Sequence, residues 1–91
     1  MWGDSLSNGE ILTVVDHGSM WEIRYQPESG GLDTVWFDWR CLAEMYEAES
    51  GSSFYKDYAF GQGASVIQEY FKGRRIEVDG EQFNETVRLL D

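Results

Sequence analysis

The stretch that decides the fold runs from Leu32 to Glu49 and reads Leu-Asp-Thr-Val-Trp-Phe-Asp-Trp-Arg-Cys-Leu-Ala-Glu-Met-Tyr-Glu-Ala-Glu. Its first part is β-branched and aromatic, which predicts a strand over Leu32–Phe37. Its second part carries apolar residues with a helical period, which predicts a helix over Trp39–Glu49. Asp38 lies between them, where a carboxylate caps the first turn of a helix. We therefore expect a strand that leads directly into a helix.

Two further strands are predicted upstream, after a polar lead-in over residues 1–9. Glu10–His17 is nearly continuous in apolar residues, and Gly18-Ser19 is typical of a tight turn. Met20–Gln26 alternates apolar and polar side chains, as a strand with one buried face does. Together with the strand over Leu32–Phe37 they predict an antiparallel meander. The rhythm of Gly9–Tyr25, with a tryptophan soon after a tight turn, is similar to that of small SH3-like barrels over these two strands.

The second half of the chain predicts a further helix. Apolar residues recur with a helical period over Ala64–Lys72, and Gly73 suits the position after a helix C-terminus. Four aromatic residues are concentrated in residues 54–60. That spacing suits either a single helical turn or an ordered aromatic loop.

A hairpin is predicted near the C-terminus. Asp79-Gly80 between alternating residues is the signature of a type I′ turn, and it would place Ile76 opposite Phe83. The tail, residues 84–91, fits either a short helix or a continued strand. We expect a single α+β domain over residues 1–91. Its mostly antiparallel sheet would combine the three-stranded meander with this hairpin, and two helices would pack on one face.

The charge of the chain is strongly negative. Seventeen acidic residues oppose seven basic ones, for a net charge of −10, and residues 1–55 hold ten of the acids with only two arginines. Such a field repels nucleic acid and anionic membranes and attracts basic surfaces. We therefore expect a basic protein partner and no direct binding of nucleic acid or membrane. Because the chain carries neither a membrane-length apolar run nor a signal-peptide pattern, the expected location is the cytoplasm.

The sequence contains no recognisable catalytic or metal-binding motif. His17 is the only histidine, the serines lie in no nucleophile elbow, and the glycines form no phosphate loop. Asp79-Gly80-Glu81 lacks the remaining oxygen ligands of a calcium loop. We therefore expect no catalysis, no metal and no cofactor.

Two smaller features have structural interpretations. Cys41 is the only cysteine, so an internal disulfide is excluded. Its place in the apolar stripe predicts a buried thiol; the stripe comprises Cys41, Leu42, Met45 and Tyr46. The basic residues at 72, 74 and 75 are interpreted as a helix C-terminal charge and as ion-pair partners of strand acids, rather than as a nucleic-acid patch.

The acids recur in a regular series. Six of them between Glu10 and Asp38 are five or six residues apart, and the predicted helix continues the series. Carboxylates spaced over one exposed face would imitate a phosphate backbone. Strand alternation predicts that Trp36 faces away from its neighbours, and an exposed ring beside carboxylates engages arginine through ion pairs and cation–π contacts. The candidate partner-binding residues are Asp33, Asp38, Glu44, Glu47 and Glu49, with Trp36 and Trp39 as anchors.

These observations support several hypotheses about function. The first is a small acidic inhibitor that occupies or occludes the nucleic-acid-binding surface of a basic protein. In size and charge alone the chain is similar to phage and mobile-element proteins that inhibit restriction or CRISPR systems. The alternative is an acidic interaction module, such as an immunity or antitoxin-like protein, with acidity that serves solubility or salt adaptation. The tryptophans would then pack into a second small core beneath residues 54–60. A monomer and a homodimer are both compatible with the sequence.

Overall fold

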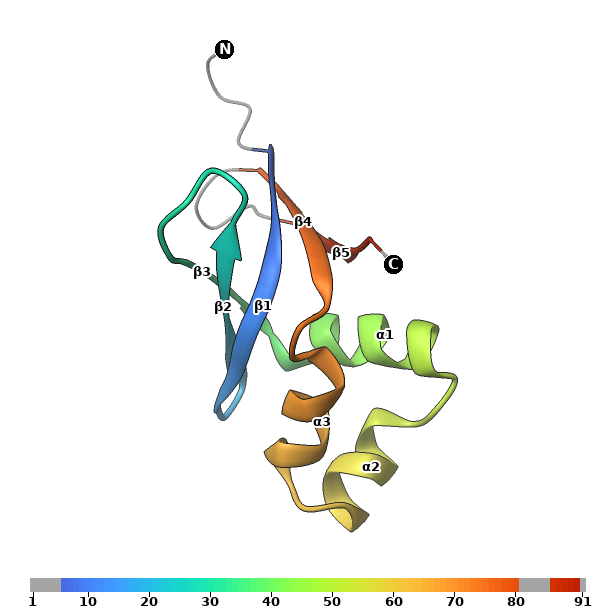
Figure 1. The fold of residues 1–91 in the computed structure, drawn as a ribbon. Coiled ribbons are helices and arrows are strands. Elements are labelled where there is room, and N and C mark those ends of the chain that lie inside the picture. The colour runs from blue at the N-terminus through green and yellow to red at the C-terminus, as the bar shows by residue number, and fades with distance from the viewer. Residues whose placement is uncertain (1–5, 81–85, 91) are drawn as a thin grey trace.

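The computed structural model describes residues 6–80 and 86–90, which form five strands and three helices. Figure 1 shows the strands side by side, with α2 and α3 beyond their lower ends. The predicted α+β class with an antiparallel sheet is confirmed, and one helix is added because residues 54–60 are helical. The elements are β1 (Leu6–His17), β2 (Met20–Pro27), β3 (Asp33–Asp38), α1 (Trp39–Ser50), α2 (Phe54–Phe60), α3 (Ala64–Phe71), β4 (Arg75–Asp79) and β5 (Thr86–Leu89).

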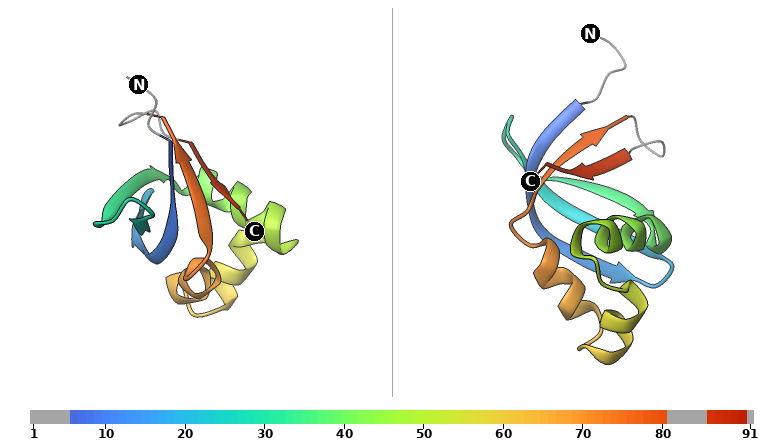
Figure 2. Two further views of the ribbon diagram at one scale, coloured as in Figure 1. Left: turned by 45° about the horizontal axis from the view of Figure 1, so that its top comes forward. Right: turned by 90° about the vertical axis from the view of Figure 1, so that its right-hand side faces the viewer.

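The five strands form one antiparallel sheet in the order β3-β2-β1-β4-β5. The longest strand, β1, pairs with β2 through its C-terminal part and with β4 through its N-terminal part. This order makes β3 and β5 the two edges of the described sheet, so the sheet is open and does not close as an SH3-like barrel does. Figure 2 shows how strongly its strands twist relative to one another.

A β-bulge in β1 decides which of its side chains enter the core. The pairing with β2 shifts register between Ile11 and Thr13, which leaves Leu12 as an extra residue. Ile11 and Val14 therefore both point inward although they are three residues apart, and each is at most 1% exposed. Because a bulge reverses the alternation of the side chains beyond it, Asp16 lies on the core side of the sheet, beside the β1–β2 turn.

Strand β3 and helix α1 join as predicted. Asp38 ends β3 in an extended conformation, and its Oδ1 accepts a hydrogen bond from the backbone N–H of Arg40 at 2.9 Å. The backbone N–H of Trp39 donates to the carbonyl of Ser19 at 3.0 Å. This bond attaches the start of α1 to the β1–β2 turn. Gly51 ends α1 in the left-handed conformation, with φ of 73°.

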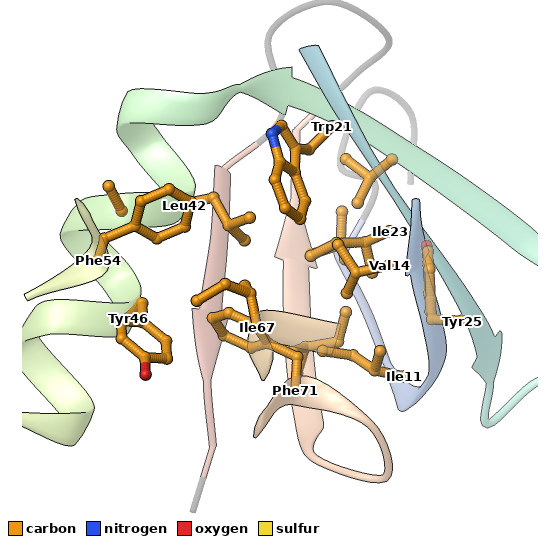
Figure 3. Close-up of a cluster of buried hydrophobic side chains, with 14 residues drawn as sticks. Ile11, Val14, Trp21, Ile23, Tyr25, Leu42, Tyr46, Phe54, Ile67 and Phe71 are labelled. Carbon is orange, nitrogen blue, oxygen red and sulfur yellow. The ribbon is translucent and has the colours of Figure 1, made fainter. Parts of the chain in front are cut away.

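One hydrophobic core lies between the sheet and the helices (Figure 3). In that view Leu42, Tyr46 and Phe54 extend from the helices toward side chains of the sheet. Burial of one large apolar side chain stabilises a fold by roughly 1.5–3 kcal/mol, so this cluster is the main source of stability. The largest fully buried side chains are Ile11, Val14, Trp21, Ile23, Val35, Leu42, Ile67, Phe71 and Ile76.

The buried face of α1 differs from the prediction. Leu42, Ala43 and Tyr46 are buried, whereas Cys41 is exposed. The predicted buried thiol is therefore wrong. The cause is α2, which the periodicity of α1 alone does not reveal. The ring of Phe54 in α2 packs against Tyr46 with centroids 5.9 Å apart, so the core covers the flank of α1 opposite to Cys41.

The C-terminal hairpin is present, but the predicted turn is wrong. Ile76 lies opposite Leu89, and Asp79 lies opposite Thr86, so six residues connect β4 to β5. Ile76 therefore does not pair with Phe83, which itself lies outside the described residues. The register of a strand is strongly specified where one of its faces is buried. Here the register places the apolar side chains of β5 against the core, and the tail adopts the strand alternative.

Candidate functional site

Two of the five predicted carboxylates are paired with arginines of the same domain. Asp38 forms an ion pair with Arg40, with Oδ1 and Nε 3.1 Å apart, in addition to its role as the α1 cap. Arg40 holds the pKa of the Asp38 carboxyl below its ordinary value. Glu49 forms an ion pair with Arg74 at 3.0 Å. The negative charges of Asp38 and Glu49 are thus largely compensated inside the domain.

The other three carboxylates have different surroundings. Glu47 accepts a hydrogen bond from the backbone N–H of Phe54 at 2.8 Å, which places its charge at the N-terminus of α2. Asp33 accepts from the hydroxyl of Tyr25 at 3.3 Å. Glu44 is exposed and has no hydrogen-bond or ion-pair partner among the described residues. Four of the five carboxylates thus have a hydrogen-bond or ion-pair partner within the domain, and Glu44 has none among the described residues.

Trp36 lies on the sheet face opposite the core, as predicted. Its side chain is 49% exposed, whereas that of Val35 is 1% exposed. The ring of Trp36 rests against the ring of His17, with centroids 4.7 Å apart. We call this group of residues the outer-face cluster: His17, Glu22, Arg24, Thr34 and Trp36.

Glu22 is the centre of the outer-face cluster and only 7% exposed. Its carboxylate accepts hydrogen bonds from Arg24 Nε at 2.9 Å and from His17 Nε2 at 2.9 Å, and it accepts a longer one from Thr34 Oγ1 at 3.4 Å. Arg24 first, and then His17, lower the pKa of Glu22 from 4.5 to about 2, despite the opposing effect of burial. The cluster thus satisfies its own carboxylate.

A second concentration of aromatic side chains surrounds an open cavity of about 190 Å³. It lies where the β1–β2 turn, the start of α1 and α2 meet. Trp21 and Phe54 are buried and form its floor, while Tyr55 is 64% exposed. We call this site the aromatic pocket and define it by its lining: Gly18, Trp21, Trp39, Phe54, Tyr55 and Tyr58.

The rings of the aromatic pocket hold one another in place. Trp39 stacks on Phe54 with centroids 6.2 Å apart and meets Tyr55 edge-on at 5.4 Å. Phe54 stacks on Tyr58 at 5.8 Å, and Trp21 meets both of these rings edge-on. Such ring pairs gain stability beyond the burial of their area. The pocket is therefore pre-formed by packing within the domain.

A carboxylate anchors one wall of the aromatic pocket. Asp16 Oδ2 accepts a hydrogen bond from the Tyr58 hydroxyl at 2.7 Å, and its Oδ1 accepts from the backbone N–H of Gly18 at 2.7 Å. The hydrogen bond to Asp16 is the main reason that the pKa of Tyr58 is raised. A negative charge thus lies directly against two of the residues that line the pocket.

Sequence reasoning identified this site only in part. It named Trp39 as an anchor, and Trp39 does line the pocket, but it also packs against residues 54–60, as the alternative predicted. Tyr55 and Tyr58 were missed as site residues, although the aromatic density of their segment was a usable signal. Asp16 was counted in the acidic series, but nothing in the sequence reveals the bulge that turns it toward the core side.

A larger groove of about 380 Å³ lies between α1 and the edge strands β3 and β5. It contains the exposed Cys41 and Glu44, and its other lining residues are Phe37, Met45, Thr86 and Val87. Within the described part of the chain, no group of three or more potential metal ligands occurs. No helix in the same part has the length and apolarity needed to cross a membrane.

Comparisons with known proteins add no assignment to this geometry. No protein-family model matches the chain, and neither the curated proteins nor the solved structures contain a match.

Proposed function

We propose that this chain is a small acidic binding protein that inhibits a basic nucleic-acid-handling protein by covering its DNA- or RNA-binding surface. In size and charge the chain is similar to phage proteins that inhibit CRISPR or restriction systems. The inhibitor would work in the cytoplasm of the producing or host cell.

The observation that carries the proposal is that the arginines of the domain form ion pairs with its own carboxylates. All five arginines form ion pairs with carboxylates of the same domain, at 2.6–3.1 Å. Glu10, Glu44 and Glu69 are exposed and have no such partner among the described residues. The arginines are thus turned toward the domain's own acids, and the exposed lysines Lys56 and Lys72 are the cations of the described chain that remain outside these ion pairs. A negative field speeds association with a basic surface and disfavours acidic ones.

Exposed aromatic side chains also support an interaction surface. Tyr55 is 64% exposed, Phe60 is 85% exposed and Trp36 is 49% exposed. Aromatic residues are enriched at the centres of protein interfaces, where they supply contact area at a low entropic cost. The combination of exposed rings with negative charge suits a partner that is rich in arginine.

The proposal is tested by capture of the partner from a lysate of the source or host cell. The tagged protein is incubated at about 0.1 M and about 0.5 M salt, a range over which surface charge pairs are progressively screened. We expect recovery of one basic nucleic-acid-binding protein, with less recovered at the higher salt. We also expect DNA or RNA to compete with the capture. A captured partner that still binds its nucleic acid fully would contradict occlusion.

Charge reversal at unpaired positions provides the matched comparison. A variant with Glu10→Lys, Glu44→Lys and Glu69→Lys should lose at least tenfold in affinity, whereas the same positions changed to glutamine should lose less. None of these side chains holds the described fold together. Glu47 is unsuitable for reversal because its carboxylate accepts from the start of α2. Equal capture by the lysine and wild-type forms would overturn the electrostatic basis of the proposal.

A further inference from the structure

We propose that the aromatic pocket receives an arginine side chain of the partner. This inference rests on the proposed function and specifies which part of the surface makes the decisive contact. Five aromatic side chains line the pocket, a carboxylate is hydrogen-bonded to two of the lining residues, and no arginine of the domain lies among them.

The geometry of the pocket fits a flat cation. The buried rings of Trp21 and Phe54 close its floor, and Trp39, Tyr55 and Tyr58 surround the opening. A guanidinium group is planar and weakly hydrated, so it stacks on aromatic faces more readily than the compact, strongly hydrated ammonium of lysine does. Because the rings already hold one another in place, little conformational entropy is lost on binding.

The electrostatics of the pocket favour a positive charge. The Asp16 carboxylate lies against the wall of the pocket through its bonds to Tyr58 and Gly18. A phenol that donates its proton to a carboxylate has a more electron-rich ring, which strengthens a cation–π contact. Residues 6–38, which supply the turn beside the pocket, hold six acids and one arginine, and α2, which supplies the two tyrosines of the pocket, holds one lysine and one aspartate. Arg24, the arginine in question, is paired with Glu22 in the outer-face cluster.

The domain already contains one example of this mode of recognition. The guanidinium carbon of Arg74 lies 5.0 Å from the centroid of the Tyr70 ring, and the same side chain forms an ion pair with Glu49 at 3.0 Å. A tyrosine face and a carboxylate thus engage one arginine within the fold. The aromatic pocket likewise places tyrosine rings near a carboxylate, although Asp16 lies behind Tyr58 and Gly18 and acts through its charge rather than through a direct contact.

The sites that contain Trp36 and Trp39 are not equivalent for this purpose. Trp36 rests against His17, and the neighbouring carboxylate of Glu22 is occupied by Arg24. A partner's arginine at Trp36 would have to displace these internal contacts. We therefore assign the contact to the aromatic pocket and not to the outer-face cluster.

The test uses the full chain and a short arginine peptide, so it does not require the natural partner. The indole N–H signals of the four tryptophans are followed by NMR during titration with tri-arginine, tri-lysine and tri-citrulline peptides. We expect tri-arginine to shift the signals of Trp39 and Trp21 more than that of Trp36. Tri-lysine should bind more weakly, and citrulline, which has a similar shape without the charge, should have little effect.

Variants of α2 distinguish binding of the peptide in the aromatic pocket from non-specific electrostatic attraction to the acidic protein. Tyr55→Leu should weaken tri-arginine binding about two- to fivefold, the range of one exposed cation–π contact. Tyr55→Phe should retain binding. Phe60→Leu is the matched control, because Phe60 is an 85% exposed aromatic of the same helix that does not line the pocket. Equal weakening by Tyr55→Leu and Phe60→Leu, or equal shifts with citrulline, would overturn the inference.

The outcome is distinguishable from that of the capture experiment. If tri-arginine does not bind at the aromatic pocket but the basic partner is still captured, the inference fails and the proposed function stands. If the peptide binds the pocket but no basic partner is captured, the inference stands and the proposed function fails.

Discussion

Trp36 and Trp39 are three residues apart in the chain, yet they belong to two sites with opposite properties. In the outer-face cluster, the ring of Trp36 rests against that of His17. The carboxylate of Glu22 accepts a hydrogen bond from Arg24 of the same strand. In the aromatic pocket, Trp39 faces an open cavity of about 190 Å³. Both sites combine tryptophan with a carboxylate, but only the first contains its own cation.

The comparison shows why composition alone is a weak guide to an interface. Aromatic rings beside acids suggest recognition of arginine in both places. At the outer-face cluster the fold supplies that arginine itself, so the cluster is a structural element. At the aromatic pocket the charge of Asp16 is met only by neutral donors, Tyr58 and Gly18. A candidate interface is therefore identified by a charge that no oppositely charged side chain of the surrounding strands and helices neutralises.

The largest expected effect is the difference in stability between alanine variants of one tryptophan from each site. Trp21→Ala should destabilise the fold by about 3–5 kcal/mol, because the side chain is 2% exposed and its loss leaves a cavity in the pocket floor. Trp36→Ala should cost only about 1 kcal/mol, since half of that ring is exposed and its main ring contact is His17. Urea unfolding at neutral pH measures both. Similar losses would show that the outer-face cluster is part of the core.

A smaller effect tests whether the outer-face cluster depends on its carboxylate. Glu22→Gln should destabilise by about 1–2 kcal/mol at pH 7, because hydrogen bonds to a charged group are lost. Glu28→Gln is the control, since its ion pair with Arg75 is largely exposed and should contribute less than about 1 kcal/mol. If both variants lose equally little, the cluster is no more than a surface ion pair.

The same glutamate predicts an acid dependence of stability. Its pKa is depressed in the folded state, to about 2 from an ordinary value of 4.5. Its contribution to stability is therefore present above pH 4.5 and is lost as the pH falls toward 2. The free energy of unfolding should therefore change less with pH in Glu22→Gln than in the wild type between pH 4.5 and 2. The same pH dependence in both proteins would show that Glu22 is not the group responsible.

The smallest effect concerns the anchor of the aromatic pocket. Asp16→Asn keeps an oxygen that can accept from Tyr58, so we expect a loss of at most about 1 kcal/mol in stability. The removal of the charge should lower the pKa of Tyr58, which the bond to Asp16 raises. The titration of Tyr58 is followed by NMR, with Tyr46 as an internal reference because its pKa of about 12 has other causes, burial first and then Asp57. An unchanged Tyr58 titration would show that Asp16 does not polarise its ring.

Local patterns were reliable where neighbouring residues alone decide the structure. Asp38 was predicted as a helix cap, and it caps α1. The turn at Gly18-Ser19 and the outward direction of Trp36 were also predicted correctly. Each of these features depends on contacts within a few residues or on the period of a single strand. Long-range packing has little influence on them.

Predictions that required knowledge of distant partners were less successful. Cys41 was expected to be buried, but α2 draws the other flank of α1 into the core. Asp79-Gly80 was expected to form a tight turn, but the apolar side chains of β5 set a longer connection. The partners of the candidate carboxylates were also not predicted: Glu49 pairs with Arg74, and Glu47 accepts from the start of α2.

The sequence by itself determined the class of the fold, most of the boundaries of its helices and strands, and the excess of negative charge. These properties follow from propensity, periodicity and composition, which are local or additive. Only the tertiary structure decided which negative charges remain unopposed and which aromatic rings stay open. The bulge at Leu12 turns Asp16 toward Tyr58, and the pairing of Arg24 with Glu22 closes the outer-face cluster. Both depend on strand register, which is set by how the whole sheet buries its apolar face.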